Sequence, residues 1–196
     1  MKLSECRWAI AATLVFLVLT SGARAADLTL FVGGAIPGKL NSDIVSAPGQ
    51  TIHDLSNSPI FGVRLNTNIV PMIGLEHTLA FSTDYLSPKS ILNTATYHGF
   101  VYNTNLMINI PIKKFVPYGT VGVGLIHQYG SSDSPIGTKL ALNYGGGIKL
   151  QRLLGPMGLR FDVRGYRAMN VVFISSKSSL NIFEASAGII FTFGSH

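Results

Sequence analysis

The side chains best able to do chemistry in this 196-residue chain are charged groups at alternate positions of apolar segments. In GLRFDVRGYR, at 158–167, Arg160, Asp162 and Arg164 occupy alternate positions, and the residues between them are apolar. Successive side chains of a strand point to opposite faces, so the three charges would share one face. Other segments carry charges on the corresponding register, namely Arg64, Glu76, Lys149 and Glu184.

Enclosed charges are costly unless they pair, so this register predicts ion pairs. One predicted hairpin sets Arg64 near Thr78 and diagonal to Glu76, and the last hairpin sets Arg164 opposite Glu184, within side-chain reach. The predicted network consists of Arg64, Glu76, Arg160, Asp162, Arg164 and Glu184. Its function is either structural, filling a closed interior, or that of a gate or selectivity lining for small ions.

Histidines and hydroxyl groups offer a second kind of site. The sequence HDLS at 53–56 holds His, Asp and Ser in a long polar segment, but a Ser-His-Asp site is defined by geometry and not by sequence spacing. His77 and His98 fall on the apolar register, and His127 lies near the end of a segment. Because these histidines are scattered and Cys6 is the only cysteine, we predict no catalytic residues, cofactor or metal site.

Eight segments of alternating hydrophobicity must position these residues. Each is about ten residues long, near the 9–11 that a tilted transmembrane strand requires. They are 27–36, 59–70, 73–82, 97–110, 116–129, 139–150, 158–167 and 181–193. Long polar connections follow the odd segments, at 37–58, 83–96, 130–138 and 168–180. Short connections follow the even segments, around Pro71, around 111–114 and at 151–157.

This pattern predicts an all-β fold, an eight-stranded antiparallel up-and-down transmembrane β-barrel with short periplasmic turns and long external loops. The polar face of the segments is also small, since it carries Gly62, Gly74, Gly99, Gly122, Gly124, Gly145, Gly147 and Gly188. Glycine weakens a strand interior unless there is no room for a larger side chain. The interior of an eight-stranded barrel is only just wide enough to be filled by side chains, so large residues there need small neighbours. Glycines facing Arg and Lys therefore favour a barrel over a soluble sheet.

Composition and the N-terminal segment restrict the class further. Charged residues are 12% of the chain, about half of the share usual in soluble domains. The first residues show a basic region, an apolar stretch from Trp8 to Leu19 and the small-residue sequence SGARA, which is typical of a secretory signal peptide. We expect cleavage after Ala25, so that 1–25 is the signal and 26–196 the barrel domain. The net charge of +6 is modest, and no nucleic-acid partner is expected.

Four segments resemble the outer-membrane β-barrel domain family, small eight-stranded barrels like the membrane domain of outer-membrane protein A. They are PYGTVGVGL (117–125), LNYGGGIKL (142–150), LRFDVRGYR (159–167) and FEASAGIIFTF (183–193). Family members resemble one another in a closing strand of pattern polar-x-Gly-x-x-aromatic-x-aromatic, which the insertion machinery reads. The matching residues are Ser186, Gly188, Phe191 and Phe193. The family usually ends on the final aromatic, whereas three residues follow it here.

The resemblance implies a monomer in the outer membrane of a Gram-negative-type envelope, with the lipid bilayer and the barrel insertion machinery as partners. We expect a structural or surface-interaction role, with external loops that carry any specificity for an unknown ligand. The alternatives are a narrow ion or small-solute channel and, less favoured, an enzyme acting on lipid A or phospholipid; a soluble periplasmic sheet protein is the alternative fold. Aromatic residues near segment ends predict interfacial girdles. They are Tyr97, Tyr118, Tyr129, Tyr144, Tyr166, Phe183, Phe191 and Phe193.

Overall fold

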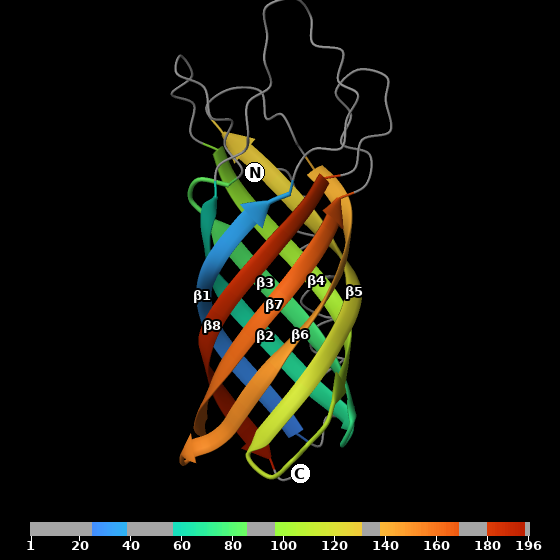
Figure 1. Ribbon diagram of the computed structural model, residues 1–196, viewed down its shortest axis with the longest axis vertical. Coiled ribbons are helices and arrows are strands. Elements are labelled where there is room, and N and C mark those ends of the chain that lie inside the picture. The colour runs from blue at the N-terminus through green and yellow to red at the C-terminus, as the bar shows by residue number, and fades with distance from the viewer. Residues whose placement is uncertain (1–24, 39–56, 86–96, 131–137, 169–179, 195–196) are drawn as a thin grey trace, which may run out of the picture.

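The computed structural model describes residues 25–38, 57–85, 97–130, 138–168 and 180–194, and they form one closed barrel of eight strands (Figure 1). The strands are β1 (Ala25–Pro37), β2 (Ser58–Val70), β3 (Ile73–Ser82), β4 (Tyr97–Asn109), β5 (Phe115–Gly130), β6 (Thr138–Leu154), β7 (Met157–Ala168) and β8 (Leu180–Gly194). Each strand pairs antiparallel with its neighbour in the chain, and β1 pairs with β8 to close the sheet. The predicted fold class is confirmed.

The two ends of the barrel differ in their connections. At the end that we call the turn end, short connections join β2 to β3, β4 to β5 and β6 to β7, and Ala25 pairs with Gly194. At the opposite, loop end, most of each long connection lies outside the described residues, as does the predicted signal peptide up to residue 24. In the described part of the chain, no helix is long and apolar enough to cross a membrane.

The β6–β7 hairpin extends further than the sequence predicted. In place of a connection at 151–157, β6 continues to Leu154 and β7 starts at Met157, with a register shift between Leu150 and Leu154. A bulge of this kind lets a strand continue past an irregular point. Gly155 then adopts a φ of 61°, which glycine reaches without steric cost, and forms the turn with Pro156.

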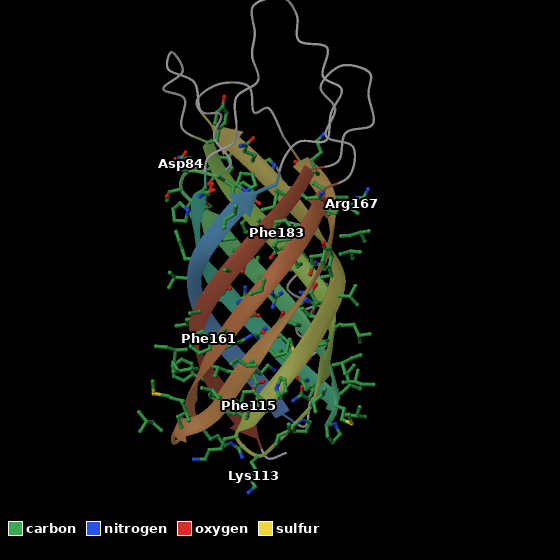
Figure 2. The ribbon with its side chains drawn as sticks, in the orientation of Figure 1. Asp84, Lys113, Phe115, Phe161, Arg167 and Phe183 are labelled. Atoms are coloured by element: carbon green, nitrogen blue, oxygen red, sulfur yellow. The ribbon has the colours of Figure 1, made fainter. Side chains whose placement is uncertain are left out.

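The two faces of the barrel follow the predicted alternation. In β7, Phe161 and Val163 are exposed on the outside, while Arg160, Asp162 and Arg164 are buried on the inside (Figure 2). The inner face continues around the barrel through the asparagines of β4 and the glycines of β5 and β6. The polar register therefore lines a narrow lumen, and the apolar register covers the exterior.

Three of the aromatic residues predicted to form interfacial girdles lie in the lumen instead. Tyr97, Tyr118 and Tyr166 are at most 6% exposed. They share the inward register, and the hydroxyls of Tyr118 and Tyr166 donate hydrogen bonds to the lumenal carboxylates of Asp162 and Glu184. The girdle prediction is wrong for these three, because tyrosine has a polar tip that suits a polar lumen as well as a membrane interface.

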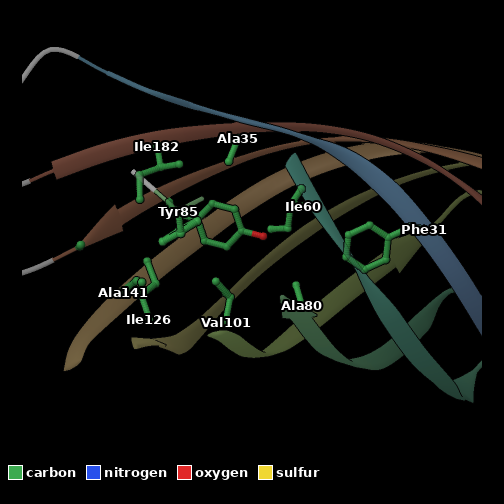
Figure 3. Packing of buried hydrophobic residues seen from close by; sticks show 11 residues of the cluster. Phe31, Ala35, Ile60, Ala80, Tyr85, Val101, Ile126, Ala141 and Ile182 are labelled. Carbon is green, nitrogen blue, oxygen red and sulfur yellow. The ribbon is translucent and has the colours of Figure 1, made fainter. Parts of the chain in front are cut away.

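Apolar side chains gather in the half of the lumen nearer the loop end, where they form what we call the loop-end cluster (Figure 3). Its members are Phe31, Ala35, Ile60, Ala80, Tyr85, Val101, Ile126, Ala141, Tyr166, Ala168 and Ile182. Tyr85 follows β3 and enters from the barrel end, and a Cβ added to Gly99 would lie 2.3 Å from its Cγ. Gly99 therefore makes room for this ring.

Candidate functional site: the charged centre of the lumen

The six charged residues of the predicted network lie together in the middle of the lumen, between the loop-end cluster and the turn end. Arg64 comes from β2, Glu76 from β3 and Glu184 from β8, while β7 supplies the other three residues. Their side chains are no more than 1% exposed. Three guanidinium groups face three carboxylates, so the set is formally neutral.

Asp162 is the centre of this set. Its carboxylate lies 2.9 Å from the nearest guanidinium nitrogen of each of the three arginines, Arg64, Arg160 and Arg164. The Tyr118 hydroxyl donates a further hydrogen bond to it. A carboxylate has two oxygens and about four lone-pair sites, so these partners use its full capacity.

Glu76 bridges two of the same arginines from the opposite side of the lumen. Its carboxylate lies 2.6 Å from Nη2 of Arg160 and 2.6 Å from Nη2 of Arg164. Because Glu76 stands on β3 and both arginines stand on β7, these ion pairs cross the barrel interior and connect strands that share no backbone hydrogen bonds. Charge-assisted contacts of this length belong to the stronger class of hydrogen-bonding interaction.

The expected registers are present, but the ion pairs differ from those expected. Arg164 stands opposite Glu184 and Arg64 stands opposite Thr78. The Glu184 carboxylate, however, accepts from Arg64, from Tyr166 Oη at 2.7 Å and from Ser186 Oγ at 2.9 Å, while Arg164 reaches Glu76. The closed lumen is narrow enough for an arginine to reach the far wall, so the nearest residue in register is not the necessary partner.

Aromatic rings complete the surroundings of two guanidinium groups. The Cζ atom of Arg64 lies 3.6 Å from the centroid of the Phe31 ring, and that of Arg160 lies 4.7 Å from the Tyr118 ring. Both distances are within the range of a cation–π interaction, which gains strength where water is excluded. The rings thus stabilise cations on the sides that carboxylates do not occupy.

A second ion pair, absent from the predicted network, lies nearer the turn end. Lys149 Nζ lies 2.9 Å from Asp27 Oδ2, and Gln151 Nε2 donates to the same carboxylate at 3.3 Å. The prediction of inward-facing charges included Lys149 but not Asp27. The alternation of Asp27 with Leu28 and Leu30 was the available signal that it faces inward.

The four residues of the predicted insertion signal occupy both faces of β8. Ser186 contacts the charged network through Glu184 and through Arg64 at 3.1 Å, and Gly188 stands opposite Arg160 on the inward register. Phe191 and Phe193 point outward near the turn end, where Phe193 is 53% exposed. These positions describe the folded strand, and recognition by the insertion machinery stays a prediction.

The histidines of the described residues lie on the outer face. His77 Nδ1 is 3.1 Å from the hydroxyls of Tyr102 and Thr104, and His127 Nδ1 is 2.7 Å from Thr138 Oγ1 near the loop end. His98 stacks on Phe81. Within the described ranges, no three His, Cys, Asp or Glu side chains come together as metal ligands, and the HDLS sequence at 53–56 lies outside those ranges.

A closed eight-stranded antiparallel barrel with a charged lumen and an apolar exterior is the fold of the small outer-membrane β-barrels. Solved structures of such proteins share it. Neisserial surface protein A is 11% identical, with a TM-score of 0.60, and the match covers 87% of this chain and 98% of that one. The outer membrane protein OprG of Pseudomonas aeruginosa is 12% identical, with a TM-score of 0.61 and coverage of 90% and 100%.

The outer membrane protein AlkL, solved in lipid bilayers, is 14% identical, with a TM-score of 0.55 and coverage of 88% and 92%. No protein-family model and no curated protein matches the sequence. Identities this low establish a common fold and leave the activity to be argued from the residues of this chain.

Proposed function

We propose that this chain is an integral outer-membrane barrel with a closed lumen, whose role in the envelope is structural or lies in surface interactions made by its long connections. The observation that carries the closed lumen is its filling in two layers. The loop-end cluster occupies one half, and the neutral network of six charged residues occupies the middle. A solute would have to displace both layers to pass.

The membrane location is supported by the outer surface. Large apolar side chains are exposed on every strand, for example Val32, Leu106, Val121 and Val163. A soluble protein rarely exposes a contiguous apolar surface larger than a few hundred Å². A belt that encircles the barrel suits the hydrocarbon core of a bilayer, which also fits the fold shared with outer-membrane proteins of known structure.

The orientation follows from the connections. Transmembrane barrels of this type place short turns in the periplasm and long loops outside the cell. We therefore assign the turn end to the periplasm and the loop end to the outer surface, where the four long connections would meet any partner. Export through a cleaved signal peptide, assembly by the insertion machinery and a monomeric state complete the proposal.

The charged network acts in this proposal as a plug and not as a gate. Each arginine is held by at least two carboxylates or hydroxyl groups from different strands, and the rings of Phe31 and Tyr118 cover two of them.

Two experiments test this function. Fractionation should place the protein with the outer membrane, and its gel mobility should change on boiling, as it does for a folded barrel. A protein that stays in solution without detergent would contradict the membrane assignment. Planar-bilayer recording of the purified protein should show no stepwise conductance. Reproducible steps would overturn the closed lumen and favour the narrow channel.

The enzyme alternative predicts a change in membrane lipids. It depends on His53, Asp54 and Ser56, which lie outside the described residues. Mass spectra of lipid A and phospholipid from cells with and without the gene should be identical under the structural proposal. A deacylated or otherwise altered lipid that appears only with the gene would support catalysis.

A further inference from the structure

The turn end of the lumen opens into a cavity of about 310 Å³. Four of the residues that line it are cationic, namely Lys113 and Lys114 in the β4–β5 connection and Lys149 and Arg152 in β6, and Asn68 and Asn109 form part of its wall. Lys113 lies at the tip of this end of the barrel (Figure 2). The volume is at the lower end of the range of about 300–1,000 Å³ that is usual for small-molecule sites.

The charge around this cavity is strongly one-sided. Among the residues that the structure describes, no Asp or Glu lines the cavity. Of the carboxylates in the described ranges, Asp27 binds Lys149 from the lumen side, and Glu76, Asp162 and Glu184 are engaged by arginines deeper in the barrel. The remaining one, Asp84, lies at the loop end (Figure 2). Four cations are thus balanced by a single acid.

The backbone of the cavity wall is held in an unusual conformation. Lys113 has a φ of 56° and Arg152 a φ of 53°, and among the described residues these are the two non-glycine residues with positive φ. A two-residue hairpin turn at Lys113 and the β6 bulge at Arg152 place these residues in this conformation, which is uncommon for side chains other than Asn and Asp. Strain of this kind is also found at ligand-binding sites. Here the same two strained residues are both cationic and both line the same cavity.

Hydrogen bonds between the two turns fix this geometry. Ile112 and Phe115 exchange backbone hydrogen bonds of 2.9 and 3.0 Å around Lys113, and the backbone N–H of Gln151 donates to the Lys114 carbonyl at 2.8 Å. Arg152 Nη2 donates to the Gly194 carbonyl, which ties the guanidinium to the end of β8. The fold therefore fixes the backbone that carries Lys113 and Lys114, and the guanidinium of Arg152, before any ligand arrives.

We propose that this cavity binds a phosphate group. Arginine recognises phosphate through paired N–H donors and lysine through a compact point charge. Lys149 is only 1% exposed and lines the inner end of the cavity. Its ammonium group has three N–H donors, of which the hydrogen bond with Asp27 uses one. The group belongs either to the headgroup of an anionic phospholipid at the leaflet that meets the turn end or to a soluble phosphate of similar size.

The test is a titration of the full-length protein, labelled with ¹⁵N, with amide signals of Lys113, Lys114 and Arg152 as the readout. One arm adds inorganic phosphate to protein in a non-ionic sugar detergent, with chloride at matched ionic strength as the reference. The other arm raises the fraction of phosphatidylglycerol stepwise in phosphatidylcholine nanodiscs, with pure phosphatidylcholine nanodiscs as the reference. The variant Lys113→Gln/Arg152→Gln neutralises two cavity cations, and Lys139→Gln/Arg167→Gln makes the same charge change near the loop end.

We expect saturable chemical-shift changes at the cavity residues in at least one arm. The affinity obtained from them should fall about tenfold or more in the cavity variant and stay unchanged in the loop-end variant. Saturation by inorganic phosphate identifies a soluble phosphate, and saturation only with phosphatidylglycerol identifies a lipid headgroup. Absence of saturable shifts in both arms, or equal weakening by both variants, would overturn the proposal. Heat-dependent gel mobility checks folding, and Lys114→Gln replaces the double variant if the latter does not fold.

Discussion

Arg64 on β2 and Glu184 on β8 form an ion pair although β1 lies between their strands. The contact runs through the lumen and not along the sheet, and it links the first hairpin of the barrel to the last strand. Arg64 also binds Asp162 on β7, so one guanidinium connects three strands. The network therefore adds ion pairs across the lumen to a barrel whose wall is otherwise stabilised by backbone hydrogen bonds between adjacent strands.

Replacing Arg64 by Met should destabilise the folded barrel. Removal of one partner from a buried ion pair leaves an uncompensated charge, at a cost of about 3–5 kcal/mol. Urea unfolding in micelles, followed by the gel mobility of the folded form, measures this difference. Arg167→Met, at an exposed position near the loop end, is the control and should stay within about 0.5 kcal/mol of the unaltered protein. Equal stability of all three proteins would contradict a stabilising network.

A pair of double-mutant cycles distinguishes spatial contact from strand register. The cycle of Arg64→Met with Glu184→Gln should give a coupling energy of at least about 1 kcal/mol, because the side chains are in direct contact. The cycle of Arg164→Met with Glu184→Gln should give a smaller value, since Arg164 stands opposite Glu184 but binds Glu76. The reverse order would show that the neighbours in register form the pair.

Gly99→Ala should destabilise the loop-end cluster by about 1–3 kcal/mol, the usual cost of overpacking. The new Cβ would lie 2.3 Å from Cγ and 2.5 Å from Cβ of Tyr85, too near the backbone for rotation of the ring to relieve the clash. The Tyr85 backbone is itself held by hydrogen bonds to Tyr97 and Gln128. Urea unfolding of the variant measures the loss.

Gly34→Ala is the matched control for this substitution. A Cβ added to Gly34 meets no other heavy atom within 4 Å, so the variant should be neutral or more stable by less than about 1 kcal/mol. If Gly99→Ala is as stable as Gly34→Ala, Tyr85 does not occupy the lumen beside β4. In that case the loop-end cluster would lack the ring of Tyr85.

The strand pattern could be predicted from the sequence because a period of two residues fixes both the element and its faces. Seven of the eight predicted segments differ from the strands by no more than two residues at either end, and β6 runs four residues further because of its bulge. The partners of the charges could not be predicted in the same way. Which carboxylate an arginine meets depends on the width of the lumen and the stagger of its strands. Arg164 shows this, because Glu184 was its predicted partner and Glu76 is the carboxylate that it binds.

Tyrosine limited the prediction for a different chemical reason. Tyr118 and Tyr166 lie near strand ends and look like girdle residues, but their hydroxyls bind Asp162 and Glu184. The register was the decisive signal, since both residues alternate with outward apolar side chains and share a face with charges. The cationic cavity was visible only as the pair Lys113-Lys114, because Lys149 and Arg152 join it through strand pairing that sequence spacing does not express.

Phe193→Ala should impair assembly of the barrel in cells far more than it impairs the stability of the folded protein. Phe193 is 53% exposed on the outer face near the turn end, so its removal leaves no cavity in the lumen. If the insertion machinery reads the closing strand, the amount of heat-modifiable protein in the outer membrane should fall several-fold, while urea unfolding of the refolded variant changes little. Phe183→Ala is the matched control, because Phe183 is 49% exposed on the same strand but near the loop end, outside the closing pattern. Equal assembly of the two variants would show that Phe193 contributes only a membrane-facing ring, and that the aromatic positions of β8 are not read as a signal.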